Sequence, residues 1–169
     1  MMSIENYKEV LEFVGTKNDT IKNRMKNINL KESNTFSYQH GLFRYNIEVM
    51  RECSRDNASR MLYNFMNDRL NGDWYVMADN LFETFCFLHE LGHLVDDNTN
   101  EGISDDGYDE FRNRKFYTER EAFDTYRKIH AEQVADDFAI SFINENITEL
   151  WKIIDKKATA EEIEFYINA

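Results

Sequence analysis

Apolar side chains near the start of the chain recur at helical spacing. Over residues 4–14 they fall three or four positions apart, and the pattern stops at Gly15. Such spacing places the apolar side chains on one side of a helix, and a glycine commonly follows the last helical residue. We therefore predict an amphipathic helix over residues 4–14.

The pattern then changes from helical spacing to alternation and back. Residues 36–49 alternate around Gly41, which predicts extended chain with a hairpin near His40-Gly41. Residues 56–70 return to helical spacing, with apolar side chains again three or four positions apart. We expect a strand pair followed by a second amphipathic helix.

A turn sequence, Asn-Gly-Asp at 71–73, separates this helix from a short apolar run at 74–77, which predicts a strand. Residues 81–95 carry apolar positions on more than one side, and Asp79 or Asn80 can cap their first turn. A helix that is apolar on several sides is buried. Residues 81–95 therefore predict a helix inside the core.

Residues 96–109 are rich in Asp, Asn and Gly, which predicts a surface loop. We tested the segment as a calcium-binding loop beginning at Asp96. The sixth position holds no glycine, and the twelfth holds Gly107 where a bidentate glutamate is required. The pattern favours a solvated loop over a calcium site.

Two sequences with capping-box spacing mark the helices of the last third. Thr118 and Glu121 precede a helical stretch that continues, with or without a break, to Asn144. Thr159 and Glu162 repeat the spacing before a last short helix.

Composition agrees with a folded chain and argues against a nucleic-acid ligand. The 169 residues fit one domain, and 42% hydrophobic with 14% aromatic residues excludes a wholly disordered chain. A net charge of −12 disfavours binding to a phosphate backbone, which depends on lysine and arginine. The one basic segment, residues 17–31, is interpreted as a solvated helix face or loop.

The first 15 residues carry three glutamates among apolar positions, so they resemble neither a signal peptide nor a membrane span. We expect a cytoplasmic protein with no membrane partner. Cys53 and Cys86 have no metal-ligand spacing, and both are expected to be reduced.

The sequence His89-Glu90-Leu91-Gly92-His93 is the strongest chemical signal. Residues four apart on a helix lie about 5–6 Å from each other, so both imidazoles can bind one zinc ion. Glu90, rotated by about 100°, can act as general base toward a metal-bound water. Chance produces this spacing in such a chain about one time in a hundred, and the alternative is two core histidines with Glu90 in a salt bridge.

A catalytic zinc site needs a third protein ligand, and Glu132 is the best candidate. It shares a helical face with Ala135, Asp136 and Ala139, whose small alanines allow close approach to the motif helix at Gly92. Asp136, one turn on, is placed to accept the distal N–H of a ligating imidazole.

Other assignments stay open at this point. His130 points about 160° away from Glu132 on a continuous helix, so both can serve only if the helix breaks. The remaining candidates for the third ligand are Asp96, Glu119 and Glu121, and the candidates for a transition-state donor or substrate contact are Tyr117, Tyr126 and His130.

The motif together with Glu-x-x-Ala-Asp-x-Phe-Ala at 132–139 resembles the ImmA/IrrE family of metallopeptidases, small relatives of thermolysin-like enzymes. Residues 126–129, Tyr-Arg-Lys-Ile, look like phage and mobile-element members, and the resemblance covers residues 74–145. It implies a mostly helical α+β, zincin-like fold with a small antiparallel sheet beside the motif helix. His89, His93 and Glu132 become the Zn²⁺ ligands and Glu90 the catalytic base.

We therefore expect a single domain over residues 1–169. An N-terminal helix and sheet extend to about residue 78, zinc-site helices occupy 79–145, and a helical tail follows over 146–169. The expected activity is that of a zinc metallo-endopeptidase whose protein substrate, by resemblance, is a repressor of a phage or mobile element. β-Augmentation would place the peptide along the edge of the strand at 74–77. The rivals are a zinc-stabilised binding protein, such as a phage-encoded antagonist, and a structural domain without metal; the oligomeric state is left open.

Overall fold

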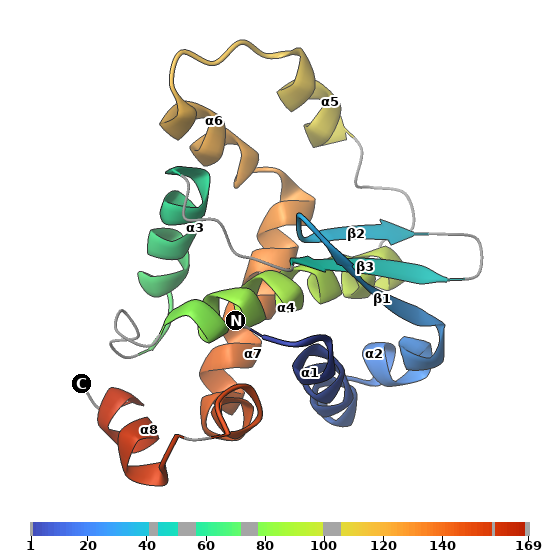
Figure 1. Cartoon of the computed structure of the whole chain (residues 1–169). Helices are drawn as coiled ribbons and strands as arrows, with labels where there is room; N and C mark the ends of the chain where they lie inside the picture. The colour runs from blue at the N-terminus through green and yellow to red at the C-terminus, as the bar shows by residue number, and fades with distance from the viewer. Residues whose placement is uncertain are drawn as a thin grey trace.

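The computed structural model describes residues 2–40, 44–50, 57–71, 78–99, 106–156 and 158–167. It is mostly helical with one small sheet, so the predicted α+β class is confirmed (Figure 1). The elements in chain order are α1 Ile4–Lys17, α2 Asp19–Arg24, the short 3₁₀ helix η1 Met25–Asn27, β1 Ile28–Ser33, β2 Ser37–His40, β3 Tyr45–Met50, α3 Asn57–Asn67, α4 Ala78–Thr99, α5 Asp106–Asn113, α6 Glu119–Tyr126, α7 His130–Ile154 and α8 Ala160–Ile167.

The sheet has the strand order β1-β3-β2. β3 pairs antiparallel with β2, as predicted, and parallel with β1, so the sheet is mixed rather than wholly antiparallel. β3 alternates between buried and half-buried side chains, which is the pattern that identifies a strand in sequence. In β1 no side chain is fully buried. The sequence pattern did not predict this strand, which begins within the basic segment at residues 17–31. The predicted turn at 41 and the predicted strand at 74–77 lie outside the described residues.

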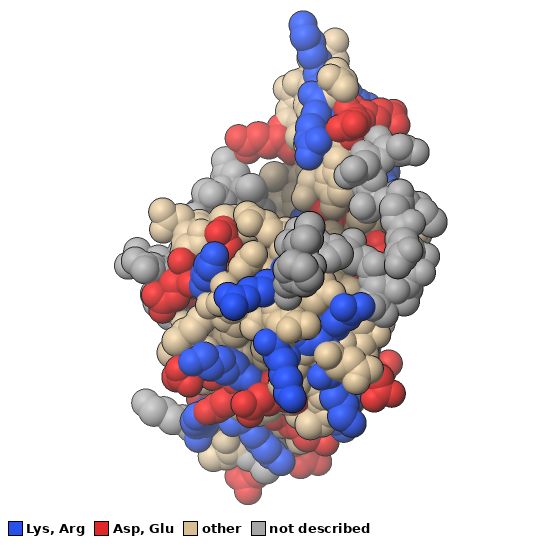
Figure 2. All heavy atoms as spheres, turned by 90° about the vertical axis from the view of Figure 1, so that its right-hand side faces the viewer, with Lys and Arg blue, Asp and Glu red and all other residues tan. Residues whose placement is uncertain are grey.

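The basic segment contributes more than a solvated surface. Its lysines at 17, 22, 26 and 31 are exposed, as predicted, on α1, α2, η1 and β1. Figure 2 views the side of the molecule on which α2 and β1 lie, and there Lys and Arg side chains gather across the middle, with Asp and Glu interspersed. The segment therefore forms a helix and part of a strand, and its lysines lie on their outer, solvated side.

Helix α4 lies between the sheet and α7, and its residues from 81 to 92 are all buried (Figure 1). It continues to Thr99, four residues beyond the predicted end, because Asp96 is buried rather than solvated. α5 begins inside the segment predicted as a loop, at Asp106, and continues beyond it to Asn113. The loop prediction for residues 96–109 is therefore wrong at both ends, and residues 100–105 lie outside the described part.

The backbones of α4 and α7 come into close contact at Gly92. A Cβ atom added to Gly92 would lie 2.7 Å from Ala135 Cα and 3.0 Å from the Ala135 carbonyl oxygen. Real Cβ atoms essentially never lie closer than 3.0 Å to another heavy atom, so only glycine fits here without a shift of the α7 backbone. The prediction that small residues let these helices approach closely is confirmed.

Other helix ends also differ from prediction. α1 continues past Gly15 to Lys17, because Gly15 is buried where α2 returns and a Cβ there would meet the end of Met25. The long helix predicted from residue 118 is two helices, with a break at 127–129 between α6 and α7. Because of this break, His130 is the first residue of a new helix.

Side-chain caps follow the predicted spacing. Thr118 accepts the Glu121 N–H, while the Glu121 carboxylate accepts from the Tyr117 N–H rather than from Thr118. Thr159 and Glu162 form the complete reciprocal box. Among the described helices, none is both long enough and apolar enough to cross a membrane.

Candidate metal centre

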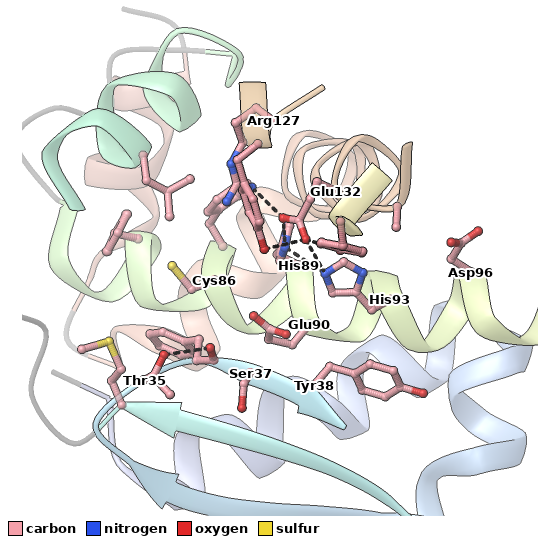
Figure 3. Close-up of a pocket in the computed structure, with 18 of the residues that line it drawn as sticks. Thr35, Ser37, Tyr38, Cys86, His89, Glu90, His93, Asp96, Arg127 and Glu132 are labelled. Carbon is pink, nitrogen blue, oxygen red and sulfur yellow. Dashed lines mark hydrogen bonds and ion pairs between the residues drawn. The ribbon is translucent and has the colours of Figure 1, made fainter. Parts of the chain in front are cut away.

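Two imidazoles from one turn of α4 converge on a single point (Figure 3). The Nε2 atoms of His89 and His93 lie 3.1 Å apart, and their ring planes are nearly perpendicular at 87°. His89 is 7% exposed, because the apolar side chains on either side of it along α4 are buried. The helical spacing therefore brings both ring nitrogens together, as predicted.

Glu132, in the first turn of α7, completes the cluster from the opposite helix. Its Oε2 lies 3.3 Å from His89 Nε2, and its Oε1 lies 3.5 Å from His93 Nε2. Ligands at about 2.0–2.1 Å from a tetrahedral zinc ion are themselves separated by about 3.3 Å. The three side chains could therefore hold a metal ion.

The chemistry of the donor atoms also fits a cation. Glu132 is 1% exposed, and within the described part of the chain its Oε2 has no hydrogen-bond partner. A buried carboxylate oxygen without a hydrogen-bond donor is costly. A positive ion between the three side chains would remove this cost.

Asp136 orients His89 from one turn further along α7. The Nδ1–H of His89 donates to Asp136 Oδ1 at 2.9 Å, which leaves the Nε2 lone pair directed at the cluster. The Arg127 guanidinium donates to the same oxygen at 2.8 Å. Asp136 therefore stands in the place predicted for it, and Arg127 pairs with the same carboxylate oxygen.

Electrostatics within the cluster shift three pKa values. Burial alone would lower the pKa of His89, but the Asp136 hydrogen bond and the Glu132 and Glu90 carboxylates outweigh it and raise the pKa to about 9. Burial would raise the pKa of Glu132, but the neighbouring imidazoles and the Tyr108 hydroxyl lower it to about 2. For Glu90 burial dominates and raises the pKa to about 7.

The cluster opens into a cavity of about 650 Å³ between α4, α7 and the sheet. Glu90 lines this cavity beside the two histidines, where it receives a hydrogen bond from the backbone N–H of Tyr38 in β2. The ring of Tyr38 stacks on that of His93 at 6.3 Å. At the other end the wall is apolar and includes the side chains of residues 50, 62, 82, 85 and 86.

Several predicted candidates fall outside the cluster. Asp96 is buried and lines the cavity but does not belong to the three converging ligands. His130 is exposed at the start of α7, and Tyr117 is 93% exposed; neither lines the cavity. Glu119 and Glu121 lie in the first turn of α6, where Glu119 is exposed and Glu121 half-buried, and both are outside the cluster.

Tyr126 lines the cavity, but its hydroxyl donates to Glu132 Oε1 at 2.9 Å. Sequence reasoning missed Tyr108, which donates to the same oxygen at 2.5 Å from α5. It also gave no role to Arg127, which was visible only as part of the Tyr-Arg-Lys-Ile resemblance. Tyr108 had no local signal, because its surroundings are Asp- and Gly-rich and its partner lies 24 residues away.

Comparison with protein-family models, with curated proteins and with solved structures finds no match to this chain. The geometry of the site therefore carries the functional inference.

Proposed function

We propose that the protein is a zinc-dependent metallo-endopeptidase. The observation that supports this most is the convergence of His89, His93 and Glu132 ligand atoms within 4.8 Å of one another, with the Glu90 carboxylate beside them in the same cavity. Two imidazoles and one carboxylate are a donor set of catalytic zinc sites in peptidases, where one coordination position stays open for water. A purely structural zinc site is normally closed by four protein ligands.

His89, His93 and Glu132 would hold the zinc ion, which would supply an acidified water and polarise the carbonyl of the scissile bond. Glu90 accepts the proton of the attacking water and delivers it to the leaving amine. Asp136 and Arg127 keep the His89 imidazole in the tautomer that offers Nε2.

An extended substrate fits along β2. Among the described strands β2 lies at one edge of the sheet, and its residues 37 and 38 line the cavity next to Glu90. A peptide that adds to this edge brings a backbone carbonyl toward the metal cluster. The edge first predicted, at 74–77, lies outside the described residues.

The family resemblance extends the proposal to the substrate. The motif and the 132–139 segment resemble ImmA/IrrE metallopeptidases, and the convergence of their residues in space supports the resemblance. On this basis the substrate is a repressor protein of a phage or mobile element.

The test substitutes Glu90→Gln and measures bound zinc by mass spectrometry and cleavage of a proteome-derived peptide library. Zinc content should stay at one ion per chain, and cleavage should fall about 10²- to 10⁴-fold, the usual contribution of a general base. Glu83→Gln is the matched control, because Glu83 is a second buried glutamate of α4 that accepts the Met2 N–H outside the cavity.

Absence of zinc from the wild-type protein would overturn the proposal. Zinc binding without cleavage, together with a biological effect that survives Glu90→Gln, would favour the zinc-stabilised binding protein instead.

A further inference from the structure

Two tyrosines of one outer segment converge on a single oxygen of Glu132. The segment, residues 106–126, comprises α5, α6 and their connection and is called the arm below; Figure 1 shows it arching over α4 and the sheet. Tyr108 of α5 and Tyr126 of α6 both point their hydroxyls at Glu132 Oε1, at 2.5 and 2.9 Å. Neither residue is close to the zinc motif in sequence.

Both hydroxyls act as donors. Each tyrosine hydroxyl donates to Glu132 Oε1, and burial keeps the pKa of both tyrosines above its ordinary value, so both hydroxyls keep their protons. An ionised carboxylate is an acceptor only, so each hydroxyl must supply its proton to the bond. Oε1 therefore holds two charge-assisted hydrogen bonds.

Ring packing holds the two hydroxyls in place. The Tyr108 and Tyr126 rings lie 6.1 Å apart, and Phe111 meets Tyr126 edge-on at 5.3 Å. The Arg127 guanidinium lies 5.1 Å from the centre of the Tyr126 ring. The hydroxyls are thus presented by a packed aromatic group, and removing a hydroxyl alone leaves that packing intact.

The other carboxylate oxygen has the opposite environment. Oε2 lies 3.3 Å from His89 Nε2 and, among the described residues, accepts no hydrogen bond. The two oxygens of one carboxylate are thereby distinguished. Oε1 accepts both tyrosine hydroxyls and also lies 3.5 Å from His93 Nε2, whereas in the described part of the chain Oε2 faces His89 and lies 3.5 Å from the Arg127 guanidinium without a hydrogen bond.

We propose that Tyr108 and Tyr126 are positioning residues that occupy Glu132 Oε1, so that Glu132 binds the metal through Oε2 alone. This inference rests on the proposed function and deepens it. A carboxylate that binds through both oxygens adds a fourth protein donor and competes with water for the open position. The tyrosine pair therefore preserves the water site, and it links that site to the arm.

The test uses Tyr108→Phe, Tyr126→Phe and the double variant in the full chain. Tyr117→Phe is the matched control, because Tyr117 belongs to the same arm but is 93% exposed and outside the cavity. Zinc affinity is measured by competition with a chromophoric chelator, and the unfolding temperature of the metal-free variants is measured alongside. The visible absorption of the cobalt(II)-substituted proteins reports coordination number, because its intensity falls when a further donor binds.

Each single substitution should weaken zinc binding about tenfold and the double substitution about a hundredfold, the range found for partners of metal ligands. The cobalt absorption of the double variant should weaken as Glu132 becomes bidentate, while Tyr117→Phe matches the wild type in both measurements. Unchanged affinity and spectra in all variants would overturn the inference but leave the proposed function standing. Weakened affinity with an unchanged cobalt spectrum would also overturn it. A wild-type protein that binds neither metal removes the proposed function itself.

Discussion

The close contact between α4 and α7 makes Gly92→Ala an informative perturbation of the metal centre. Gly92 lies between the two histidines, and Ala135 lies between Glu132 and the rest of α7, yet neither residue binds the metal. The Cβ added by the substitution would lie 2.7 Å from Ala135 Cα, whereas an ordinary contact begins at 3.4 Å. The two backbones must therefore separate locally by about 0.7 Å. Metal–ligand distances tolerate about 0.2 Å.

The expected effect on stability is small, because two contributions oppose each other. Overpacking of this kind costs about 1–3 kcal/mol, while replacing glycine by alanine inside a helix contributes about 1 kcal/mol in the favourable direction. The net loss should be about 1 kcal/mol. Zinc affinity should fall at least tenfold, since the separation acts directly on the distance between Glu132 and the histidines.

The assay pairs chelator competition for zinc affinity with thermal unfolding of the metal-free protein. Gly15→Ala is the control: this glycine also lies within a helix, but its added Cβ meets only the flexible end of Met25. Gly15→Ala should keep wild-type zinc affinity. If Gly92→Ala also retains wild-type affinity and raises the unfolding temperature, the helices are not held at contact distance and the reasoning fails.

Three further predictions concern His89 and its partner Asp136. Asp136→Asn should weaken zinc binding about 10- to 100-fold, because the charge that orients the imidazole and pairs with Arg127 is lost; Asp137→Asn, at an exposed ion pair with Arg69, should leave affinity unchanged. Zinc binding at pH 7 should release about one proton, since His89 has a pKa of about 9 without metal and must be neutral to ligate. Calorimetry in buffers of different ionisation enthalpy measures this release, and a value near zero would contradict the protonated state. In the metal-free protein the raised His89 pKa contributes stability that is complete below pH 6.5 and is lost as the pH rises through about 9.

The core of the site was predictable because its signals are local or periodic. His89 and His93 are one turn apart, so their convergence follows from helix geometry alone. Glu132 was chosen because it shares a face with small alanines, and the contact between Gly92 and Ala135 shows why small residues are required there. Asp136 followed from the same periodicity.

The features that prediction missed depend on contacts between distant segments. β1 is stabilised by parallel pairing with β3. The sequence of β1 shows no alternation of apolar and polar residues, because both faces of its second half are solvated. The end of α4 continues because Asp96 is buried in the cavity wall, whereas its sequence neighbours are typical of a loop. Tyr108 acts on a carboxylate brought to it by tertiary structure, and no spacing rule links the two.

The positions of the ligands on α4 and α7 also have a consequence for folding. His89 and His93 are near neighbours in the chain, but His89 and its partner Asp136 are 47 residues apart. An unfolded chain can thus offer an ion the histidine pair alone, while Glu132 arrives only after the long intervening segment has closed. A bound ion therefore acts as a cross-link that reduces the conformational freedom of that segment, and the metal-bound protein is expected to unfold at a higher temperature than the metal-free protein.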